Sequence, residues 1–358
     1  MARERKKRGW FSRITFGSAS LALSGLLLLC YASVLVNPAK AWFFTIFGLL
    51  FLPLVILTGL FFLWALFRRS RTAFLLALML LPALLLLGRY YQFRGPEDTS
   101  EPSLKVVSYN VGVFAHPDGE EDRLDLADSV AAYLRRTGAD IICLQEFYLP
   151  QQQEVGGWLR RHFPGYQAEY YLLTGKKGRF GNVILSRYPI VAKGKFDFEK
   201  SANMAFYADI RLPSTTLRFY NCHFESYNIS IPALIKRIGK EEDVMEDTGR
   251  RMRRTITQRP QQVEAVMRDI DACPLHSVVL GDFNDTPVSY TYQRLRRGRS
   301  DAFVKAGKGF GATYRLLQPL LRIDYILYPE DLEAVSYAVD QVRYSDHNPV
   351  IVSLYEKR

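Results

Sequence analysis

The sequence predicts an α/β sheet domain preceded by membrane-spanning helices, and two features of its 358 residues predict this division. Up to Arg94 the chain consists largely of long apolar stretches without charge, which is typical of helices in a bilayer. From Leu104 short apolar runs alternate with longer amphipathic stretches, the pattern of strands and helices packed around a sheet.

The formal net charge of +11 belongs wholly to the N-terminal part. Residues 1–94 contain 12 Lys and Arg against the single acid Glu4, whereas residues 95–358 contain 35 basic and 35 acidic side chains. A sequence pI near 9.4 would ordinarily indicate nucleic-acid binding. Because the excess flanks apolar stretches and the larger domain is neutral, the global charge gives no support for a nucleic-acid partner.

Three uncharged apolar stretches predict three transmembrane helices, at about 14–36, 42–67 and 72–88. The first two exceed the roughly 20 residues that a helix needs to cross hydrocarbon, and the third is shorter. Buried helices of a soluble core would show amphipathic periodicity, which these stretches lack. Ala39 and Ala41 also resemble a signal-peptide cleavage site, but the preceding apolar run is longer than a usual signal core.

The distribution of Lys and Arg predicts how these helices are oriented. The N-terminal tail and the second loop, 68–71, are rich in Arg and Lys, whereas the first loop has only Lys40. Because basic loops stay in the cytoplasm, three crossings place the following domain outside, in the periplasm of a bacterium with two membranes. Without the third crossing the domain would be cytoplasmic. We thus expect an integral protein of the bacterial inner membrane, with the lipid bilayer as one partner.

Residues 95–103 (GPEDTSEPS) form a polar, Pro-containing linker before the sheet domain. Two apolar stripes predict helices, one from Ala127 to Leu134 that stops at Gly138 and one from Val263 to Ile270 after Pro260. Short apolar runs predict the strands 104–109, 141–145, 182–186, 216–222, 278–281 and 323–328. The four cysteines show no spacing typical of zinc sites or disulfides.

Polar side chains follow the ends of these strands, and they are the candidates for chemistry. The segments are Ser108–Asn110, Leu144–Glu146, Asn221–His223, Gly281–Asp285, Arg322–Tyr325 and Ser345–His347. In an open α/β sheet such ends converge where ligands bind. Each segment alone has another interpretation, since Asp and Asn also cap turns and helices.

In this order the segments resemble the endonuclease/exonuclease/phosphatase (DNase I-like) superfamily, from about Leu104 to about Leu354. The most specific are 281–284 (GDFN) and 345–350 (SDHNPV), and 181–190 (GNVILSRYPI) also resembles the family pattern. The resemblance implies a four-layer α/β sandwich, two packed mixed β-sheets flanked by helices. It identifies residues 104–358 as the catalytic domain of a membrane-anchored bacterial member.

The residue types also fit phosphoester hydrolysis with a divalent cation. Mg²⁺ prefers oxygen ligands, so Glu146 and Asn110 are the predicted metal ligands, and Mn²⁺ could substitute for it. Asp282 is the predicted general base for a water nucleophile, and Asn284 would orient that water. The metal would stabilise charge on the phosphoryl and leaving oxygens.

Two histidines complete the predicted catalytic group. His223 and His347 can donate protons to phosphoryl or leaving oxygens, and a carboxylate partner fixes the tautomer of such an imidazole. The family pattern makes Asp324 the partner of His347 and places Asp346 near the metal or a second metal position. His223 is typical of the deoxyribonuclease, sphingomyelinase and inositol-phosphatase branches, and the abasic-site repair nucleases have a different residue there.

The resemblance, together with the predicted membrane segment, implies three possible functions. The first is a membrane-anchored phosphodiesterase or phosphatase acting on lipid head groups or other small phosphoesters, and the alternative is an extracytoplasmic endonuclease acting on nucleic acid. The third, less favoured, is a non-catalytic phosphate-binding membrane sensor. No protein partner is evident. Two basic stretches, 250–259 and 294–299, are candidates for contacting an anion or for a solvated helix face.

Overall fold

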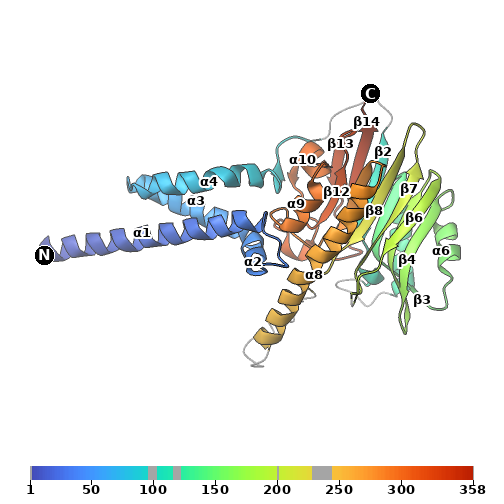
Figure 1. The fold of residues 1–358 in the computed structure, drawn as a ribbon, viewed down its shortest axis with the longest axis horizontal. Helices are drawn as coiled ribbons and strands as arrows, with labels where there is room; N and C mark the ends of the chain where they lie inside the picture. Colours follow the sequence, from blue (N-terminus) through green and yellow to red (C-terminus); the bar gives the residue numbers. More distant parts are fainter. Residues whose placement is uncertain (1, 96–102, 116–121, 200, 228–243, 358) are drawn as a thin grey trace.

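The computed structural model describes residues 2–95, 103–115, 122–199, 201–227 and 244–357 (Figure 1). Within helix α1 (Ala2–Ser33) the side chains are described from Ile14 onward. The predicted linker, 95–103, lies almost entirely outside the described residues. A helical arm projects from a larger body built on two β-sheets (Figure 1).

The arm does not contain the three spanning helices that the sequence predicts. In the described chain one helix segment, Ile14–Ser33 of α1, is long and apolar enough to cross a membrane by itself. Helices α2 (Phe43–Leu49) and α3 (Phe51–Phe67) meet that criterion only as a pair, and they are bent by 63°. Helix α4 (Thr72–Leu87) has only 16 residues. The described chain therefore contains one helix that could span a membrane, or two spans if the bent pair α2–α3 forms a single span.

Proline explains why the second apolar stretch is broken. The sequence predicts Pro53 inside one long helix, but it lies in the first turn of α3, directly after the non-helical Leu50 (φ −88°, ψ 6°). The first N–H groups of a helix have no intrahelical acceptor, so proline costs little there. A helix start at Phe51 therefore avoids the clash that Pro53 would cause in mid-helix.

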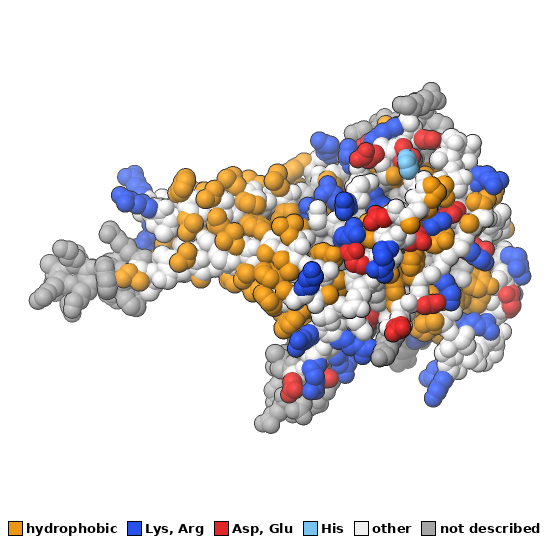
Figure 2. All heavy atoms as spheres, viewed as in Figure 1, with side chains coloured by type: hydrophobic (Ala, Val, Ile, Leu, Met, Phe, Trp, Pro, Cys, Tyr) orange, Lys and Arg blue, Asp and Glu red, His pale blue; other side chains and the backbone are white. Residues whose placement is uncertain are grey.

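The arm has polar groups inside and apolar side chains outside. The buried hydroxyls of Ser20, Ser24 and Thr58 donate to backbone carbonyls one turn earlier in their own helices, at 2.7–2.9 Å. Leu21 and Phe67 are 65% and 81% exposed, and apolar side chains dominate the visible surface of the arm (Figure 2). Such a surface is costly in water and favourable in lipid.

Two six-stranded sheets form the body. The first has the order β13-β14-β2-β3-β5-β4, and the second has the order β10-β12-β9-β8-β7-β6. The pairs β2–β3 and β8–β9 are parallel, and the other pairs within the two sheets are antiparallel. The strands of the first sheet are β13 (Leu332–Val339), β14 (Val350–Glu356), β2 (Leu104–Asn110), β3 (Ile141–Pro150), β5 (Gly178–Ser186) and β4 (Gln167–Thr174). Those of the second are β10 (Ser300–Asp301), β12 (Asp324–Tyr328), β9 (Ser277–Asp282), β8 (Thr216–His223), β7 (Met204–Arg211) and β6 (Ile190–Phe196).

Helices cover the outer faces of both sheets, which makes four layers. One buried cluster joins the inner faces, with Val106 of the first sheet and Phe219 of the second among its members. A second cluster packs α5 (Arg123–Arg136) and α6 (Val155–His162) on the first sheet. A third packs α8 (Val244–Ala272) and α9 (Tyr290–Arg296) on the second. The predicted four-layer α/β sandwich is therefore confirmed.

The predicted helical stripes lie on α5 and α8. Helix α5 begins after Asp122, whose carboxylate accepts the Leu124 N–H, and it ends before Gly138, which has φ +65°. Helix α8 starts well before Pro260, which lies inside it, and the stripe from Val263 to Ile270 is buried. The short elements are η1 (Gly112–Phe114), α10 (Ala302–Ala306) and η2 (Arg315–Leu317).

The arm is docked on the body beside helix α9. The pairing of β1 (Tyr91–Gln92) with β11 (Gly309–Phe310) joins them. The buried Arg322 donates to the Arg89 carbonyl at 3.0 Å and pairs with Asp301 at 2.8 Å. Val288, from the loop between β9 and α9, is buried in the cluster that packs the arm. The loop that begins at the end of β9 therefore touches the arm directly.

Candidate active site

The site lies where the parallel strands of the two sheets end. Asn110 is the last residue of β2, His223 the last of β8 and Asp282 the last of β9, and Asp324 begins β12 beside it. Glu146 lies within β3, where the register with β5 shifts and its own φ is +52°. Such a bulge re-aims the side chain, which explains why Glu146 points toward Asn110 instead of following the strand alternation.

Asp282 is the centre of the site. Its buried Oδ2 accepts the Asn110 amide at 2.9 Å, and its Oδ1 accepts the Asn284 backbone N–H at 2.8 Å. The Nε2 atoms of His223 and His347 lie 3.8 and 3.7 Å from Oδ2. Burial raises the pKa of Asp282 to about 6, and the neighbouring imidazoles oppose that rise. This carboxylate can therefore accept a proton near neutral pH.

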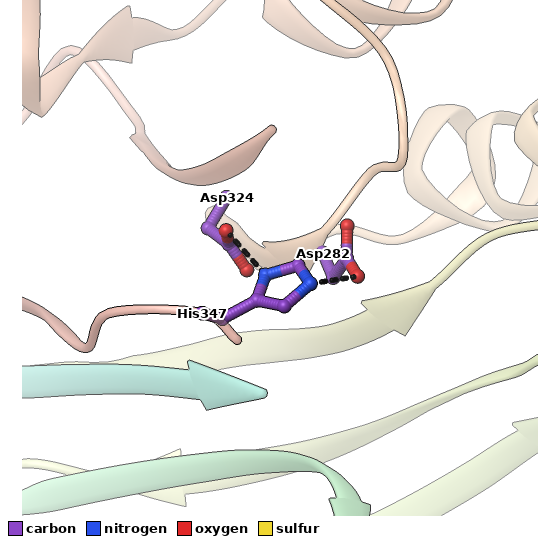
Figure 3. A group of neighbouring side chains, drawn as sticks. All are labelled: Asp282, Asp324 and His347. Carbon is purple, nitrogen blue, oxygen red and sulfur yellow. Dashed lines mark hydrogen bonds and ion pairs between the residues drawn. The ribbon is translucent and has the colours of Figure 1, made fainter. Parts of the chain in front are cut away.

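His347 lies between two carboxylates (Figure 3). Its Nδ1 is 2.9 Å from Asp324 Oδ2, and its Nε2 faces Asp282. Burial alone would lower the pKa of His347, but Asp324 and Asp282 together raise it well above its usual range. The two carboxylates therefore favour the protonated ring, Asp324 holds it in one orientation, and its Nε2 faces Asp282 as a donor.

Glu146 and Asn110 form the other side of the site. Glu146 Oε1 lies 3.1 Å from the Asn110 amide nitrogen and 3.6 Å from His223 Nε2, and the carboxylate is 33% exposed. The Asn110 amide nitrogen donates to both Glu146 and Asp282, while its oxygen accepts the Gly112 N–H. Asn110 therefore hydrogen-bonds to both carboxylates. Its side-chain oxygen would have to release the Gly112 N–H in order to bind a cation.

Two positions can be compared as candidates for a metal. Donor atoms of Asp282, Asp324 and His347 all lie within 4.8 Å of one another. Asp324 Oδ2 and His347 Nδ1 already contact each other at 2.9 Å, however, and Asp282 Oδ2 already accepts the Asn110 amide. Glu146 offers a partly exposed carboxylate oxygen, the donor type that hard divalent cations prefer. The residues thus fit a divalent cation on the Glu146 side better than between Asp324 and His347.

Asp346 lies in the turn that also carries His347. Its backbone carbonyl accepts the Arg315 N–H at 2.8 Å, and Oδ1 lies 3.3 Å from the Ser345 hydroxyl. The Ser345 hydroxyl donates to the backbone carbonyl of Asn110 at 2.9 Å, which places the turn beside the end of β2. The structure brings Asp346 close to Asn110 through Ser345, and its role at a metal stays a prediction.

Sequence reasoning missed the amides that support the site from below. Gln145 donates to Asn221 at 2.7 Å, and Asn221 donates to the carbonyls of Leu144 and Val183. These buried side chains link the two sheets directly beneath Glu146 and His223. Both amides lie in strand-end segments that the sequence singles out, but nothing in one sequence shows that they face each other. A further contact comes from Arg315, whose guanidinium donates to the Ser345 carbonyl and which lies in no motif.

Gly281 lets the strand that carries Asp282 approach its neighbour. Its φ is +122°, and a Cβ there would lie 2.0 Å from the Cys222 carbonyl oxygen of β8. We expect Gly281→Ala to destabilise the fold by about 3 kcal/mol and to reduce activity, because β9 must move. Thermal unfolding of the full chain measures this. Gly249→Ala, at an exposed position of α8 with open space around the new methyl, should be neutral or slightly stabilising. Equal melting temperatures for both variants would contradict the prediction.

Two packed mixed sheets with acidic and imidazole side chains at their strand ends define the DNase I-like α/β sandwich class. Residues 107–347 match the Endonuclease/Exonuclease/phosphatase family, and the chain belongs to that family. Members of the superfamily hydrolyse phosphoester bonds and typically depend on a divalent metal. Residues 12–90 match a domain of unknown function (DUF8431). A comparison with curated proteins finds no match.

Solved structures share the fold. An endonuclease/exonuclease/phosphatase from Beutenbergia cavernae DSM 12333 is 19% identical with a TM-score of 0.53, over 71% of this chain and 72% of that one. A protein of the same description from Bacteroides vulgatus is 19% identical with a TM-score of 0.53, over 72% of this chain and 100% of that one. A family protein from Bacteroides thetaiotaomicron is 18% identical with a TM-score of 0.50, over 73% and 99%. At these identities the likeness concerns the fold alone.

Proposed function

We propose that this protein is a membrane-anchored, Mg²⁺-dependent phosphoester hydrolase that activates water for attack on phosphorus. One observation carries the proposal: the buried Asp282 carboxylate, with its raised pKa, is held by two asparagines and faces two imidazoles. A general base needs a pKa near the working pH and a fixed orientation, and Asp282 has both.

Each side chain of the site has its own role in the proposed reaction. Asp282 accepts the proton of the attacking water, and Asn284, whose amide donates to the Phe224 carbonyl, limits where that water can lie. His347, kept cationic by Asp324, donates its Nε2–H to the phosphoryl or leaving oxygen, and His223 faces the same place from β8. Glu146, with Asn110 beside it, would hold the metal, which supplies charge stabilisation when bound.

Removal of the metal should abolish hydrolysis. We expect an excess of EDTA to lower the rate by at least about a hundredfold, because the cation stabilises negative charge that the two imidazoles alone stabilise less well. Adding Mg²⁺ should restore the rate, and Mn²⁺ should replace it in part. The assay follows phosphate release by the full chain in detergent. An activity indifferent to EDTA would contradict the proposal, and an unchanged melting temperature in EDTA would show that the fold is intact.

The substrate class we favour is a small phosphoester or lipid head group. Tethering restricts the enzyme to the membrane plane, where lipid substrates are, and the neutral domain lacks the basic excess that nonspecific DNA binding uses. A panel of phospholipids, sphingomyelin, inositol phosphates, plasmid DNA and RNA tests this. Cleavage confined to DNA would favour the endonuclease instead.

We further propose that the domain lies outside the cytoplasm. The basic tail lies at the start of α1 and favours the cytoplasm, so one crossing by α1 brings its far end outside. Helix α3 leads away from the body and α4 returns to it, so this pair leaves the side unchanged (Figure 1). An alkaline phosphatase fusion at Gly95, directly after the arm, tests the placement. An active fusion supports an extracytoplasmic domain, and an inactive one contradicts it.

A further inference from the structure

A pocket lies where the end of α1 meets helix α9, and none of its lining residues belongs to the strand ends that carry the site at Asp282. Val34 and Leu35, which follow α1, line one side of it. Four arginines line the other side: Arg294, Arg296, Arg297 and Arg299. The pocket therefore joins an apolar wall from the arm to a basic wall from the body, and Figure 2 shows Lys and Arg side chains grouped where the arm meets the body.

The basic wall has more positive charge than its neighbours neutralise. Arg294 pairs with Glu264 at 2.8 Å and with Asp271 at 3.8 Å, so two carboxylates face the four arginines. Arg299 donates to the Ser277 hydroxyl and to backbone carbonyls. Among the described residues, Arg296, Arg297 and Arg299 have no carboxylate within ion-pair distance. The pocket thus carries an excess of guanidinium charge that an anion can neutralise.

Two guanidinium nitrogens of the basic wall lack acceptors and lie beneath the pocket surface. Arg294 Nη1 and Arg296 Nε are buried and have no hydrogen-bond partner within the described part of the chain. A buried N–H of a charged group is costly to leave unpaired. A guanidinium presents its donors in a planar fork that matches the oxygens of a phosphate. The positive charge and planar donors of this wall therefore match the chemistry of a phosphate or a similar oxyanion.

The apolar wall lies at the end of the helix that is able to cross a membrane. Leu35 is 78% exposed and follows α1 by two residues. Nearby, the guanidinium carbon of Arg253 in α8 lies 5.7 Å from the ring centre of Trp42, at the start of α2. Tryptophan and arginine are typical of the boundary between the hydrocarbon and the head groups. A lipid whose phosphate reaches the arginines could lay an acyl chain along Leu35.

We propose that this pocket binds the phosphate of an anionic phospholipid from the leaflet in which α1 ends. The inference rests on the proposed membrane anchoring and is independent of the proposed hydrolysis. The guanidinium excess favours a head group with net negative charge, such as phosphatidylglycerol, over the zwitterionic phosphatidylethanolamine, whose ammonium group would face the arginines. The lipid is a bound ligand here, distinct from any substrate at Asp282.

Native mass spectrometry of the full chain in mild detergent tests the proposal, with phosphatidylglycerol and phosphatidylethanolamine of equal chain length as probes. We expect preferential retention of phosphatidylglycerol, and about tenfold weaker retention by the double variant Arg296→Gln/Arg297→Gln. The control, Arg160→Gln/Arg161→Gln, removes two exposed charges from α6 on the far side of the body (Figure 1) and should retain the lipid. The single variant Arg297→Gln, at an exposed position, should show part of the loss and keeps the test valid if the double variant is unstable.

Equal retention of both lipids, or equal loss in the control, would overturn the proposal. Displacement of the lipid by inorganic phosphate or by an oligonucleotide at the same concentration would also overturn it, in favour of a soluble anion. Hydrolysis of a soluble phosphoester should be unchanged in the Arg296→Gln/Arg297→Gln variant, so failure of the proposed activity is recognised separately. Release of the chain from membranes by alkaline carbonate would refute the anchoring itself.

Discussion

Replacing Asp282 by Asn should lower kcat for phosphoester hydrolysis by about a thousandfold. The amide keeps the shape of the carboxylate but does not accept a proton, and it removes the charge that lies 3.7 Å from His347 Nε2 and 3.8 Å from His223 Nε2. Because both carboxylate oxygens accept N–H groups, the amide turns its NH2 toward a donor, so the melting temperature should fall while the fold is retained. The measurement is the steady-state rate with Mg²⁺, together with thermal unfolding.

Asp128→Asn is the matched control for this variant. Asp128 also contacts an imidazole, His162 Nε2 at 2.9 Å, but on the surface of the first sheet's helical layer. We expect kcat to be unchanged there. If Asp282→Asn retained more than about a tenth of the wild-type rate while remaining folded, Asp282 would not be the general base.

The second large effect is expected at Asp324. Asp324→Asn removes the charge that holds His347 cationic, so the pKa of His347 should fall and kcat should drop by about a hundredfold. The direction follows from the sign of the interaction, because the carboxylate favours the protonated ring and its loss favours the neutral ring. NMR of histidine-labelled protein follows the titration, and steady-state kinetics follow the rate.

Asp331→Asn gives the comparison at a partly exposed pair outside the site. Asp331 Oδ2 lies 2.7 Å from His276 Nδ1, a similar carboxylate–imidazole contact on the surface. Its loss should leave the rate unchanged. If the titration of His347 were unchanged in Asp324→Asn, Asp324 would not control the protonation of that ring. If the variant hydrolysed substrate at the wild-type rate, the His347 proton would not be needed for the reaction.

The elements of the body could be predicted where each has a local signal. Apolar runs of strand length, and the stripe from Ala127 to Leu134, correspond to β2, β3 and α5. Elements with a weaker signal could not be predicted in this way. Strand β4 is partly exposed along its length, and α8 continues through Pro260, where a local rule places a helix start. Strand β4 is held by its pairing with β5, and Ile256 and Arg259 of α8 are buried before Pro260, so tertiary contacts outweigh local preference in both cases.

The site residues could be predicted individually, but their arrangement could not. The motif order singles out Asp282, His347 and Asp324, and the fold brings them together because β9 and β12 are neighbours in one sheet. The bulge that turns Glu146 toward Asn110 has no sequence signal, since it depends on how β3 pairs with β5. From the sequence the pocket arginines could be recognised only as a basic stretch. The pocket itself could not be predicted, because its opposite wall comes from residues 34 and 35, far away in the chain.

By itself, the sequence determined which residues could carry chemistry, where the apolar arm gives way to a neutral domain, and that a sheet would join the motifs. These are properties of composition and of short periodic patterns, which every segment carries locally. Tertiary structure alone decided that Asp282 is buried between two imidazoles and that four arginines meet the end of α1. Each of these depends on contacts between segments distant in sequence.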